Sequence, residues 1–143
     1  MYGRPSISRS RLLKTANKGD TSIQVESGLS WEVNDKIGLA PTAVNWFELD
    51  YAIIKTYDNV TGITNLDRTL DHYHYGSALS TGDQYSGVDM RGEVMLLTRN
   101  VRIVGNDTEA WGCQVVTSDF IEGNGEKRYG KTVLDNVEIY NCS

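Results

Sequence analysis

Residues 88–101 read VDMRGEVMLLTRNV, and this stretch decides the expected fold. Apolar and charged residues alternate along it, which is typical of a strand with one buried face. The apolar positions that share this face are Val88, Met90, Val94 and Leu96. We therefore expect a half-buried strand that begins at the start of the stretch.

The charged face of the same stretch consists of Asp89, Arg91 and Glu93. An acid, a base and an acid at a spacing of two predict a line of ion pairs, with Arg91 between its neighbours. The structural interpretation is a charged strand face at the junction of two subdomains. The alternative is a site for a sugar or a cation.

The chain before this stretch consists of short strand candidates separated by turn residues. Strands are expected at about residues 11–16, 21–25, 36–40, 48–57 and 62–66. Gly, Asn and Asp cluster between these segments, which is turn chemistry. The sequence therefore predicts a small antiparallel sheet or barrel and no amphipathic helix.

The chain after this stretch contains a repeat. Arg99-Asn100-Val101-Arg102-Ile103 and Asp135-Asn136-Val137-Glu138-Ile139 follow the same pattern at an offset of 36 residues. An Asn at a bend followed by a short strand is typical of coils of a parallel β-helix. Residues 112–117 are a candidate for one more strand. Each coil buries its inner face only by stacking on a neighbour, so a coil end requires a cap.

These patterns predict an all-β chain in two parts. Residues 1–76 are expected to form a small β-barrel-like subdomain, and residues 77–86 a polar linker loop. Residues 87–143 are expected to form the first coils of a right-handed parallel β-helix.

Composition excludes several classes of function. The net charge of −5 argues against a nucleic-acid partner, which requires a basic surface. No apolar run approaches the roughly 20 residues of a membrane-spanning helix, so no membrane insertion is expected. Residues 1–11 lack the apolar core of a signal peptide. We therefore expect an internal segment, or a mature chain cut from a precursor.

Three motifs resemble one family of extracellular proteins. Residues 31–42 read WEVNDKIGLAPT, residues 70–76 read LDHYHYG, and the third motif is the stretch 88–101. They resemble fibrocystin-L, the hyaluronan-binding cell-migration protein and the transmembrane cell-surface hyaluronidase. Asn34 stands where that family has Gly, and Asn tolerates a positive φ better than other non-Gly residues.

The resemblance implies a cell-surface or secreted scaffold in which a glycine-rich β domain precedes β-helix repeats. Structural motif positions carried over from it are Trp31, Asp35, His74, Gly76, Asp89, Arg91, Glu93, Arg99 and Asn100.

Secretion would explain two further features. N-x-S/T sequons occur at Asn59, Asn106 and Asn141, and with the resemblance they predict a glycosylated chain. Cys113 and Cys142 permit one disulfide, because neighbouring β-helix coils stack about 4.8 Å apart. The alternative is two reduced, buried thiols.

His72 and His74 are the metal-like residues of the chain. At a spacing of two on a strand they would point to one side and could share a zinc ion. No third and fourth ligands stand at a usable spacing, so we expect no metal and no cofactor. His74 is expected to belong to a structural H-x-G turn.

Asp35 is the one candidate catalytic residue, because some members of the resembled family depolymerise hyaluronan. Ala43 stands where the hyaluronan-active members have Asp, so one candidate carboxylate is missing. Glycoside hydrolysis usually requires two carboxyl groups, and only Glu48 and Asp50 remain nearby. The alternative role of Asp35 is to form a turn, and the sequence favours a protein that is not an enzyme.

The aromatic residues Trp31, Trp46, Phe47 and Trp111 could stack on saccharide rings. We expect Trp31 to fill the core of the first subdomain and Trp46 to be exposed on a loop.

Two functions follow as hypotheses. The first is an extracellular, glycosylated structural or assembly module that self-associates into filaments or contacts neighbouring domains of a longer chain. The second is a domain that binds or depolymerises a hyaluronan-like polysaccharide. A fragment of a large receptor-like protein without activity of its own is a third interpretation.

Overall fold

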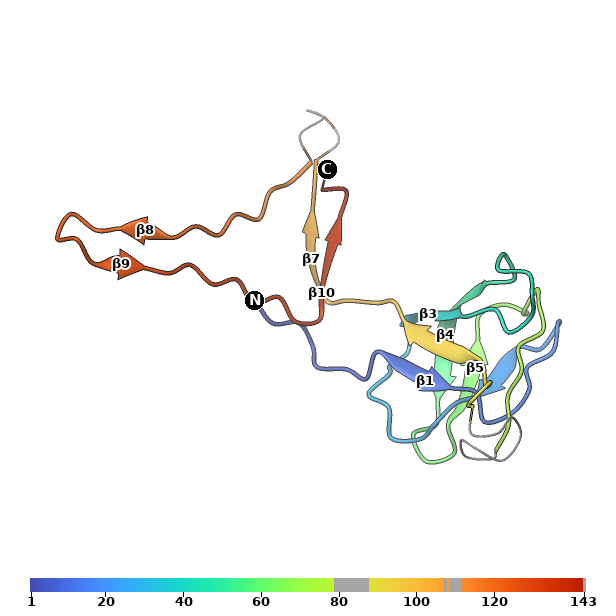
Figure 1. Cartoon of the computed structure of the whole chain (residues 1–143). Coiled ribbons are helices and arrows are strands. Elements are labelled where there is room, and N and C mark those ends of the chain that lie inside the picture. The colour runs from blue at the N-terminus through green and yellow to red at the C-terminus, as the bar shows by residue number, and fades with distance from the viewer. Residues whose placement is uncertain (79–87, 107, 109–111, 143) are drawn as a thin grey trace. The chain divides into compact units, whose positions relative to one another are not determined.

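The computed structural model describes residues 1–78, 88–106, 108 and 112–142, and no α-helix occurs among them. The chain divides into two compact units (Figure 1). One unit is Ser6–Thr98, here called the barrel unit. The other combines Met1–Pro5 with Arg99–Ser143 and is called the rung unit.

The barrel unit is one six-stranded sheet in the order β1-β6-β3-β4-β5-β2, and every pairing in it is antiparallel. Its strands are β1 (Arg9–Arg11), β2 (Ser22–Gln24), β3 (Lys36–Leu39), β4 (Asp50–Tyr57), β5 (Ile63–Leu66) and β6 (Glu93–Leu96). The expected strands are confirmed, except that the first lies earlier than residues 11–16 and the others start or end one or two residues inside the expected bounds.

The sheet curls so that its two outer strands approach each other. Leu12, directly after β1, pairs with Val25, directly after β2. The amide of Leu13 donates to the carbonyl of Gln24 at 2.8 Å. The barrel-like subdomain expected from the sequence is therefore present as a curled half-barrel.

The core of the barrel unit lies on the concave side of this sheet. In β4 the side chains alternate, with Asp50, Ala52 and Ile54 buried and the residues between them exposed. Trp31 is 4% exposed, and its Nε1 donates to the carbonyl of Ile7 at 2.7 Å, which confirms its expected core position. The buried hydrophobic residues are Leu12, Ala16, Ile23, Val25, Leu29, Trp31, Ile37, Leu39, Ala52, Ile54, Leu66, Leu70, Val94 and Leu96.

The stretch that predicted a strand from Val88 onward is bent in its first part. Val94 and Leu96 are buried as expected, but Val88 and Met90 are more than half exposed and the strand begins only at Glu93. The backbone amide of Arg91 donates to Asp89 Oδ1 at 3.0 Å, which is the geometry of an Asx turn. The alternating pattern before Glu93 therefore lies in a turn and not in a strand.

The boundary between the two units lies after Thr98. Strand β6 pairs with β1 and β3, and the amide of Leu97 donates to the carbonyl of Lys36 at 2.8 Å. Residues 88–98 thus belong to the barrel unit, and not to a β-helix beginning at residue 87. Of the expected linker at residues 77–86, only residues 77 and 78 are described.

Asn34 adopts the conformation expected from its place in the turn before β3. Its φ is +72°, and its amide donates to the carbonyl of Ile54 at 2.8 Å. Asn visits this region at low cost, whereas a residue with an unsubstituted hydrocarbon side chain does so at a cost of about 1 kcal/mol.

We expect Asn34→Ala to lower the free energy of unfolding of the barrel unit by about 1 kcal/mol. Asn34→Gly should change it by less than about 0.5 kcal/mol, because Gly adopts a positive φ freely. Urea unfolding followed by the fluorescence of buried Trp31 measures both. Equal losses in the two variants would show that backbone conformation is not what selects Asn here.

The rung unit contains a parallel strand pair, β7 (Val101–Val104) with β10 (Val137–Tyr140). The register places Val101 opposite Val137 and Ile103 opposite Ile139, which is the 36-residue offset of the sequence repeat. The two repeats therefore stack as neighbouring rungs. Among the described residues this is the one parallel strand pair, so the structure shows two stacked rungs and does not show a parallel β-helix of several coils.

The chain between the two rungs differs from the expected third rung. Residues 112–117 form no strand, and Gly112 makes only an isolated bridge with Asn106. An antiparallel hairpin follows instead, in which β8 (Phe120–Ile121) pairs with β9 (Lys127–Arg128) (Figure 1). The turn sequence Glu122-Gly123-Asn124-Gly125-Glu126 reverses the chain, with Gly125 at a φ of +87°.

The N-terminal residues complete the first rung. The Met1 amino group donates to the carbonyl of Val133 at 3.0 Å, and the amide of Gly3 donates to the carbonyl of Asp135 at 2.8 Å. A Cβ on Gly3 would lie 2.0 Å from the carbonyl oxygen of Asn136, so this approach requires Gly. By the 36-residue offset of the rungs, residues 97–99 would be expected to lie beside residues 133–135. Residues 1–3 lie there instead.

Candidate functional site

A buried aspartate–histidine pair is the main polar feature inside the barrel unit. Asp50 begins β4 on its buried side, and His74 lies in the LDHYHYG motif. The His74 side chain is 0% exposed, and its Nε2 lies 2.9 Å from Asp50 Oδ2. Its other nitrogen, Nδ1, lies 3.0 Å from the carbonyl oxygen of Ala40. His74 therefore ties residues 40, 50 and 74 together.

The His74 ring is held from both sides. Nδ1 faces the carbonyl of Ala40, which only accepts hydrogen bonds, so Nδ1 is the donor in that contact. Nε2 faces the carboxyl group of Asp50. The two contacts together fix the orientation of the ring.

Asp50 also organises the backbone of the motif. Its Oδ1 accepts from the amide of Asp71 at 3.1 Å, and its Oδ2 accepts from the amide of His72 at 3.0 Å. Burial by itself would raise the pKa of Asp50. The hydrogen bonds from His74 and from these two amides outweigh burial, so the pKa of Asp50 lies below its ordinary value. The Asp50 side chain is 4% exposed, and its carboxylate holds the backbone of the motif in place.

His72 and His74, which are two positions apart, both face the carboxyl group of Asp50. His72 Nδ1 lies 3.5 Å from Asp50 Oδ1 and makes no hydrogen bond among the described residues. Both nitrogens of His74 already face oxygen atoms of the barrel unit, at 3.0 and 2.9 Å. Among the described residues no three His, Cys, Asp or Glu side chains are arranged to hold a metal ion.

Asp35, the candidate catalytic residue, stabilises a turn. It is 4% exposed, and its Oδ2 accepts from the amide of Glu32 at 2.8 Å. The amide of Asp35 donates back to the carbonyl of Glu32 at 3.1 Å. Its carboxylate and that of Asp50 are both buried and bonded to backbone amides. Neither is placed as the exposed acid that glycoside hydrolysis requires.

The Gly76 position in the same motif requires glycine. A Cβ there would lie 2.3 Å from the carbonyl oxygen of Lys14. The Gly76 carbonyl accepts from Thr15 Oγ1 at 2.9 Å, and its amide donates to the same oxygen at 3.2 Å. The H-x-G turn is therefore a packing motif.

Asp89 and Arg91 form a two-point ion pair on the barrel unit. Arg91 Nε donates to Asp89 Oδ1 at 2.9 Å, and Arg91 Nη2 donates to Oδ2 at 2.8 Å. Arg11 Nη1 donates to the carbonyl of Arg91 at 2.9 Å, and Glu26 Oε1 lies 3.6 Å from Arg91 Nη2. Of the expected line of three charges, the Asp89–Arg91 pair is present. Glu93 does not extend the line, because its carboxylate lies 3.8 Å from Arg9 Nη1 on β1.

This pairing holds the pKa of Asp89 far below its usual range. The hydrogen bonds from the Arg91 side chain are the main cause, and they outweigh the opposite effect of burial, so the pKa falls to about 2. The Asp89 side chain is 15% exposed. The stabilisation is therefore present at pH values above the ordinary aspartate pKa of about 3.9 and is lost as the pH falls through about 2.

We expect Asp89→Asn to lower the free energy of unfolding of the barrel unit at pH 7 by about 1–2 kcal/mol. The wild-type chain should lose a similar amount between pH 5 and pH 2, and the variant should lose less over this range. Urea unfolding at a series of pH values measures both slopes. The same pH dependence in the two proteins would assign the acid sensitivity to other carboxylates.

An exposed aromatic pair lies on the loop between β3 and β4. Trp46 is 72% exposed and Phe47 is 68% exposed, and their ring centroids are 3.6 Å apart. Val44, two residues earlier, is fully exposed. The expected exposure of Trp46 is confirmed. Trp111 lies outside the described residues.

A shallow hollow adjoins the start of this loop. Its lining residues are Arg11, Ala40, Pro41, Thr42, Ala43, Asp89, Met90, Arg91, Gly92 and Glu93. The hollow is thus lined by carboxylates and guanidinium groups, and by the first residues of the β3–β4 loop, which carries the exposed rings.

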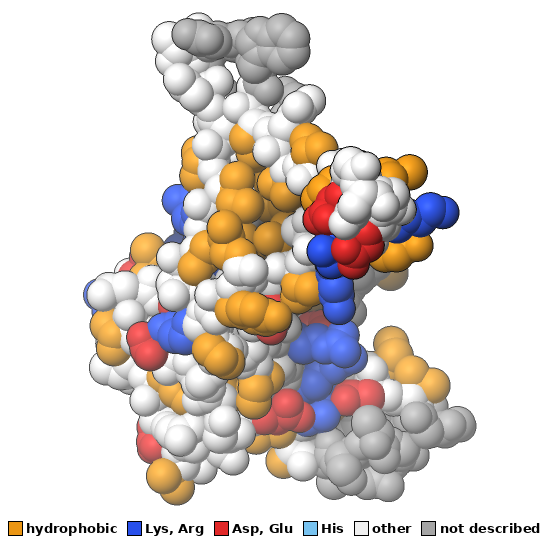
Figure 2. Space-filling view, turned by 90° about the vertical axis from the view of Figure 1, so that its left-hand side faces the viewer, with side chains coloured by type: hydrophobic (Ala, Val, Ile, Leu, Met, Phe, Trp, Pro, Cys, Tyr) orange, Lys and Arg blue, Asp and Glu red, His pale blue; other side chains and the backbone are white. Residues whose placement is uncertain are grey.

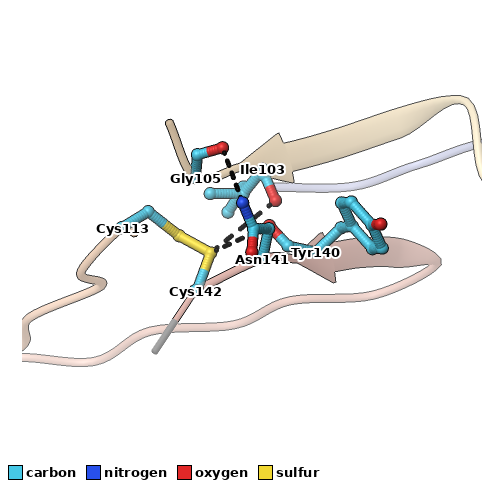
Figure 3. The surroundings of a disulfide bond; sticks show 6 residues. All are labelled: Ile103, Gly105, Cys113, Tyr140, Asn141 and Cys142. Atoms are coloured by element: carbon cyan, nitrogen blue, oxygen red, sulfur yellow. Dashed lines mark hydrogen bonds between the residues drawn. A yellow bond between two sulfur atoms is a disulfide. The ribbon is translucent and has the colours of Figure 1, made fainter. Parts of the chain in front are cut away.

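The predicted disulfide joins Cys113 and Cys142, with 4.5 Å between the two Cα atoms (Figure 3). Cys142 follows β10, and its sulfur lies 3.9 Å from the carbonyl oxygen of Ile103. Asn141 Nδ2 donates to the carbonyl of Gly105 at 3.4 Å, 36 residues earlier. The disulfide therefore closes the segment that leads from one rung to the next.

The remaining motif residues lie in the rung unit or on its turns. Asn100 Oδ1 accepts from the amide of Arg4 at 2.6 Å, and Arg99 is half-buried beside it. The sequon residues Asn59, Asn106 and Asn141 are all exposed. The described residues include no helix that is long and apolar enough to cross a membrane.

Sequence reasoning missed the role of Asp50 as the partner of His74. The sequence pattern could have revealed it. Asp50 lies two residues before Ala52 and four before Ile54, so its carboxylate is on the same, buried face of the strand. A buried carboxylate requires a partner.

No family model matches the chain. The chain is similar to human fibrocystin-L, with 26% identity over 98% of the chain, and to mouse fibrocystin-L, with 21% identity over 98%. It is also similar to mouse fibrocystin, with 32% identity over 86% of the chain. It spans about 3% of the length of these relatives. The resemblance inferred from the three motifs is thus confirmed: nearly the whole chain is similar to one short segment of fibrocystin-type proteins.

Proposed function

We propose that this chain is a structural module of an extracellular protein, built to hold and extend stacked β-rungs. The observation that carries the proposal is the parallel, in-register stacking of β7 on β10, closed by Cys113–Cys142. The described polar clusters support it, because Asp50, His74, Asp35 and the Asp89–Arg91 pair all bond to other parts of the barrel unit. Each of these side chains is held by other groups of the barrel unit, which is what a role in stabilising the fold requires.

An extracellular location is part of the proposal. Disulfides persist in secreted and cell-surface proteins, where the surroundings are oxidising. The three sequon asparagines are exposed, which is necessary for glycan attachment. The similarity to segments of fibrocystin-L and fibrocystin adds support.

Secretion of the chain from a eukaryotic cell line, followed by intact mass measurement, tests the location. We expect Cys113 and Cys142 to resist alkylation until the chain is reduced. We also expect a loss of mass on treatment with peptide-N-glycosidase. Asn59→Gln, Asn106→Gln and Asn141→Gln assign the occupied sites one at a time. Two alkylatable thiols together with no glycan at any sequon would contradict the proposal.

Binding of a hyaluronan-like polysaccharide is the second candidate function. The observation that favours it is the exposed Trp46–Phe47 pair, because exposed rings stack on sugar faces. The pair lies on the loop whose first residues line a charged hollow. Size-defined hyaluronan oligosaccharides and isothermal calorimetry test it. We expect Trp46→Ala with Phe47→Ala to weaken binding about tenfold or more. Tyr73→Ala, which removes another exposed ring, is the matched control. Lack of binding by the wild-type chain would exclude this candidate.

A further inference from the structure

The described part of the rung unit has an apolar strand pair and no buried hydrophobic core. None of the buried hydrophobic residues of the described chain lies in this unit. Val104, Ile139 and Tyr140 are each about half exposed on β7 and β10. Figure 2 shows several hydrophobic side chains gathered on the surface of the molecule. Isolated two-stranded sheets are marginal in water, so this pair requires further strands.

Each strand of the pair has one edge without a strand partner among the described residues. β7 pairs only with β10, and β10 pairs only with β7. Because the two strands are parallel, the outward edge of β10 presents the same backbone pattern that β7 presents to β10. A strand with the sequence pattern of β7 therefore fits that edge in the same register.

The side chains of the two rungs are complementary in a way that continues beyond the pair. Val101 lies opposite Val137 and Ile103 lies opposite Ile139, so identical apolar residues are paired across the two strands. On the opposite face of the strand pair, Arg102 Nε lies 2.7 Å from Glu138 Oε2. A second β7 placed beyond β10 would bring another Arg to Glu138, and other Val and Ile side chains to Val137 and Ile139.

We propose that the outer edge of β10 binds the outer edge of β7 of a second copy of this chain, in parallel and in the same register. The contact joins unlike surfaces and is open, so repetition gives a linear array of stacked rungs. The proposal deepens the proposed structural function and rests on it. The partner is a second copy because its β7 carries both the arginine that complements Glu138 and the Val-x-Ile pattern that matches β10.

A charge exchange tests the contact without disturbing the single copy. The double variant Arg102→Glu with Glu138→Arg keeps an ion pair between positions 102 and 138 of the same copy. It also keeps an ion pair between position 138 of one exchanged copy and position 102 of the next. In a mixed array, the unchanged Glu138 of one copy meets the glutamate introduced at position 102 of the other. Like charges on adjacent strands oppose pairing. Exchanged and wild-type chains should therefore associate with themselves and not with each other.

Affinity capture by a tagged wild-type chain, with sedimentation velocity of each protein alone, provides the readout. We expect capture of the untagged exchanged chain to be about fivefold weaker than capture of the untagged wild type. Exchange of the exposed Arg68–Asp71 pair in the barrel unit, by Arg68→Asp with Asp71→Arg, is the matched control and should be captured like wild type.

Two results would overturn the contact. One is equal capture of exchanged and wild-type chains, which would leave self-association but assign it to another surface. The other is a wild-type chain that is still monomeric at about 1 mM. Neither result bears on the disulfide and glycans, which test the proposed function separately.

Discussion

Replacing Cys113 and Cys142 with serine is expected to unfold the rung unit while Ser6–Thr98 stays folded. The disulfide closes a loop with a sequence separation of 29 residues, and such a bond stabilises by about 3–4 kcal/mol. The rung unit contributes none of the buried hydrophobic residues of the described chain, so little else opposes this loss. The barrel unit contains the whole buried core and should be unaffected.

Limited trypsin digestion measures this effect, because Arg102, Lys127, Arg128 and Lys131 lie in the rung unit. In the double serine variant we expect rapid cleavage at these sites and persistence of a fragment that contains the barrel unit. Val116→Ser places serine at an exposed site in the same segment and should digest like wild type. If the serine variant resisted trypsin as well as the wild type, the disulfide would not hold the rungs together.

Replacing His74 with alanine should produce the largest loss of stability in the barrel unit. The change removes the partner of a buried carboxylate, leaves the carbonyl of Ala40 without its donor and creates a cavity. Breaking a buried charged pair in this way costs about 3–5 kcal/mol. The barrel unit should then unfold at a much lower urea concentration.

Urea unfolding followed by Trp31 fluorescence gives this free energy, with His72→Ala as the matched control. The His72 side chain is 35% exposed and its Nδ1 makes no hydrogen bond within the described residues, so its loss should cost less than about 1 kcal/mol. Similar losses in the two variants would mean that the link from Asp50 to His74 is not what stabilises the motif.

The strands of the barrel unit could be predicted because their signals are local. Alternation of buried and exposed residues located β4 and β5, and the turn at Asn34 required only a residue that accepts a positive φ. The parallel register of β7 and β10 was also predictable, because a repeat with a fixed offset specifies which residues face each other.

The parts that sequence reasoning missed depend on contacts between distant residues. Asp50 and His74 are 24 positions apart, and no local pattern joins them. Arg91 was expected to pair with both of its neighbours, but Glu93 faces Arg9 on the adjacent strand instead. Residues 112–117 carry the β-branched residues of a strand, yet only Gly112 pairs with another segment, through an isolated bridge with Asn106.

Nuclear magnetic resonance of the oxidised chain tests whether residues 101–104 and 137–140 are neighbouring parallel rungs. We expect cross-strand nuclear Overhauser effects that join Val101 with Val137 and Ile103 with Ile139. Effects that join Val101 with Tyr140 and Val104 with Val137 would indicate an antiparallel pair. That result, or no effects between the two segments, would show that the two segments do not stack as parallel rungs.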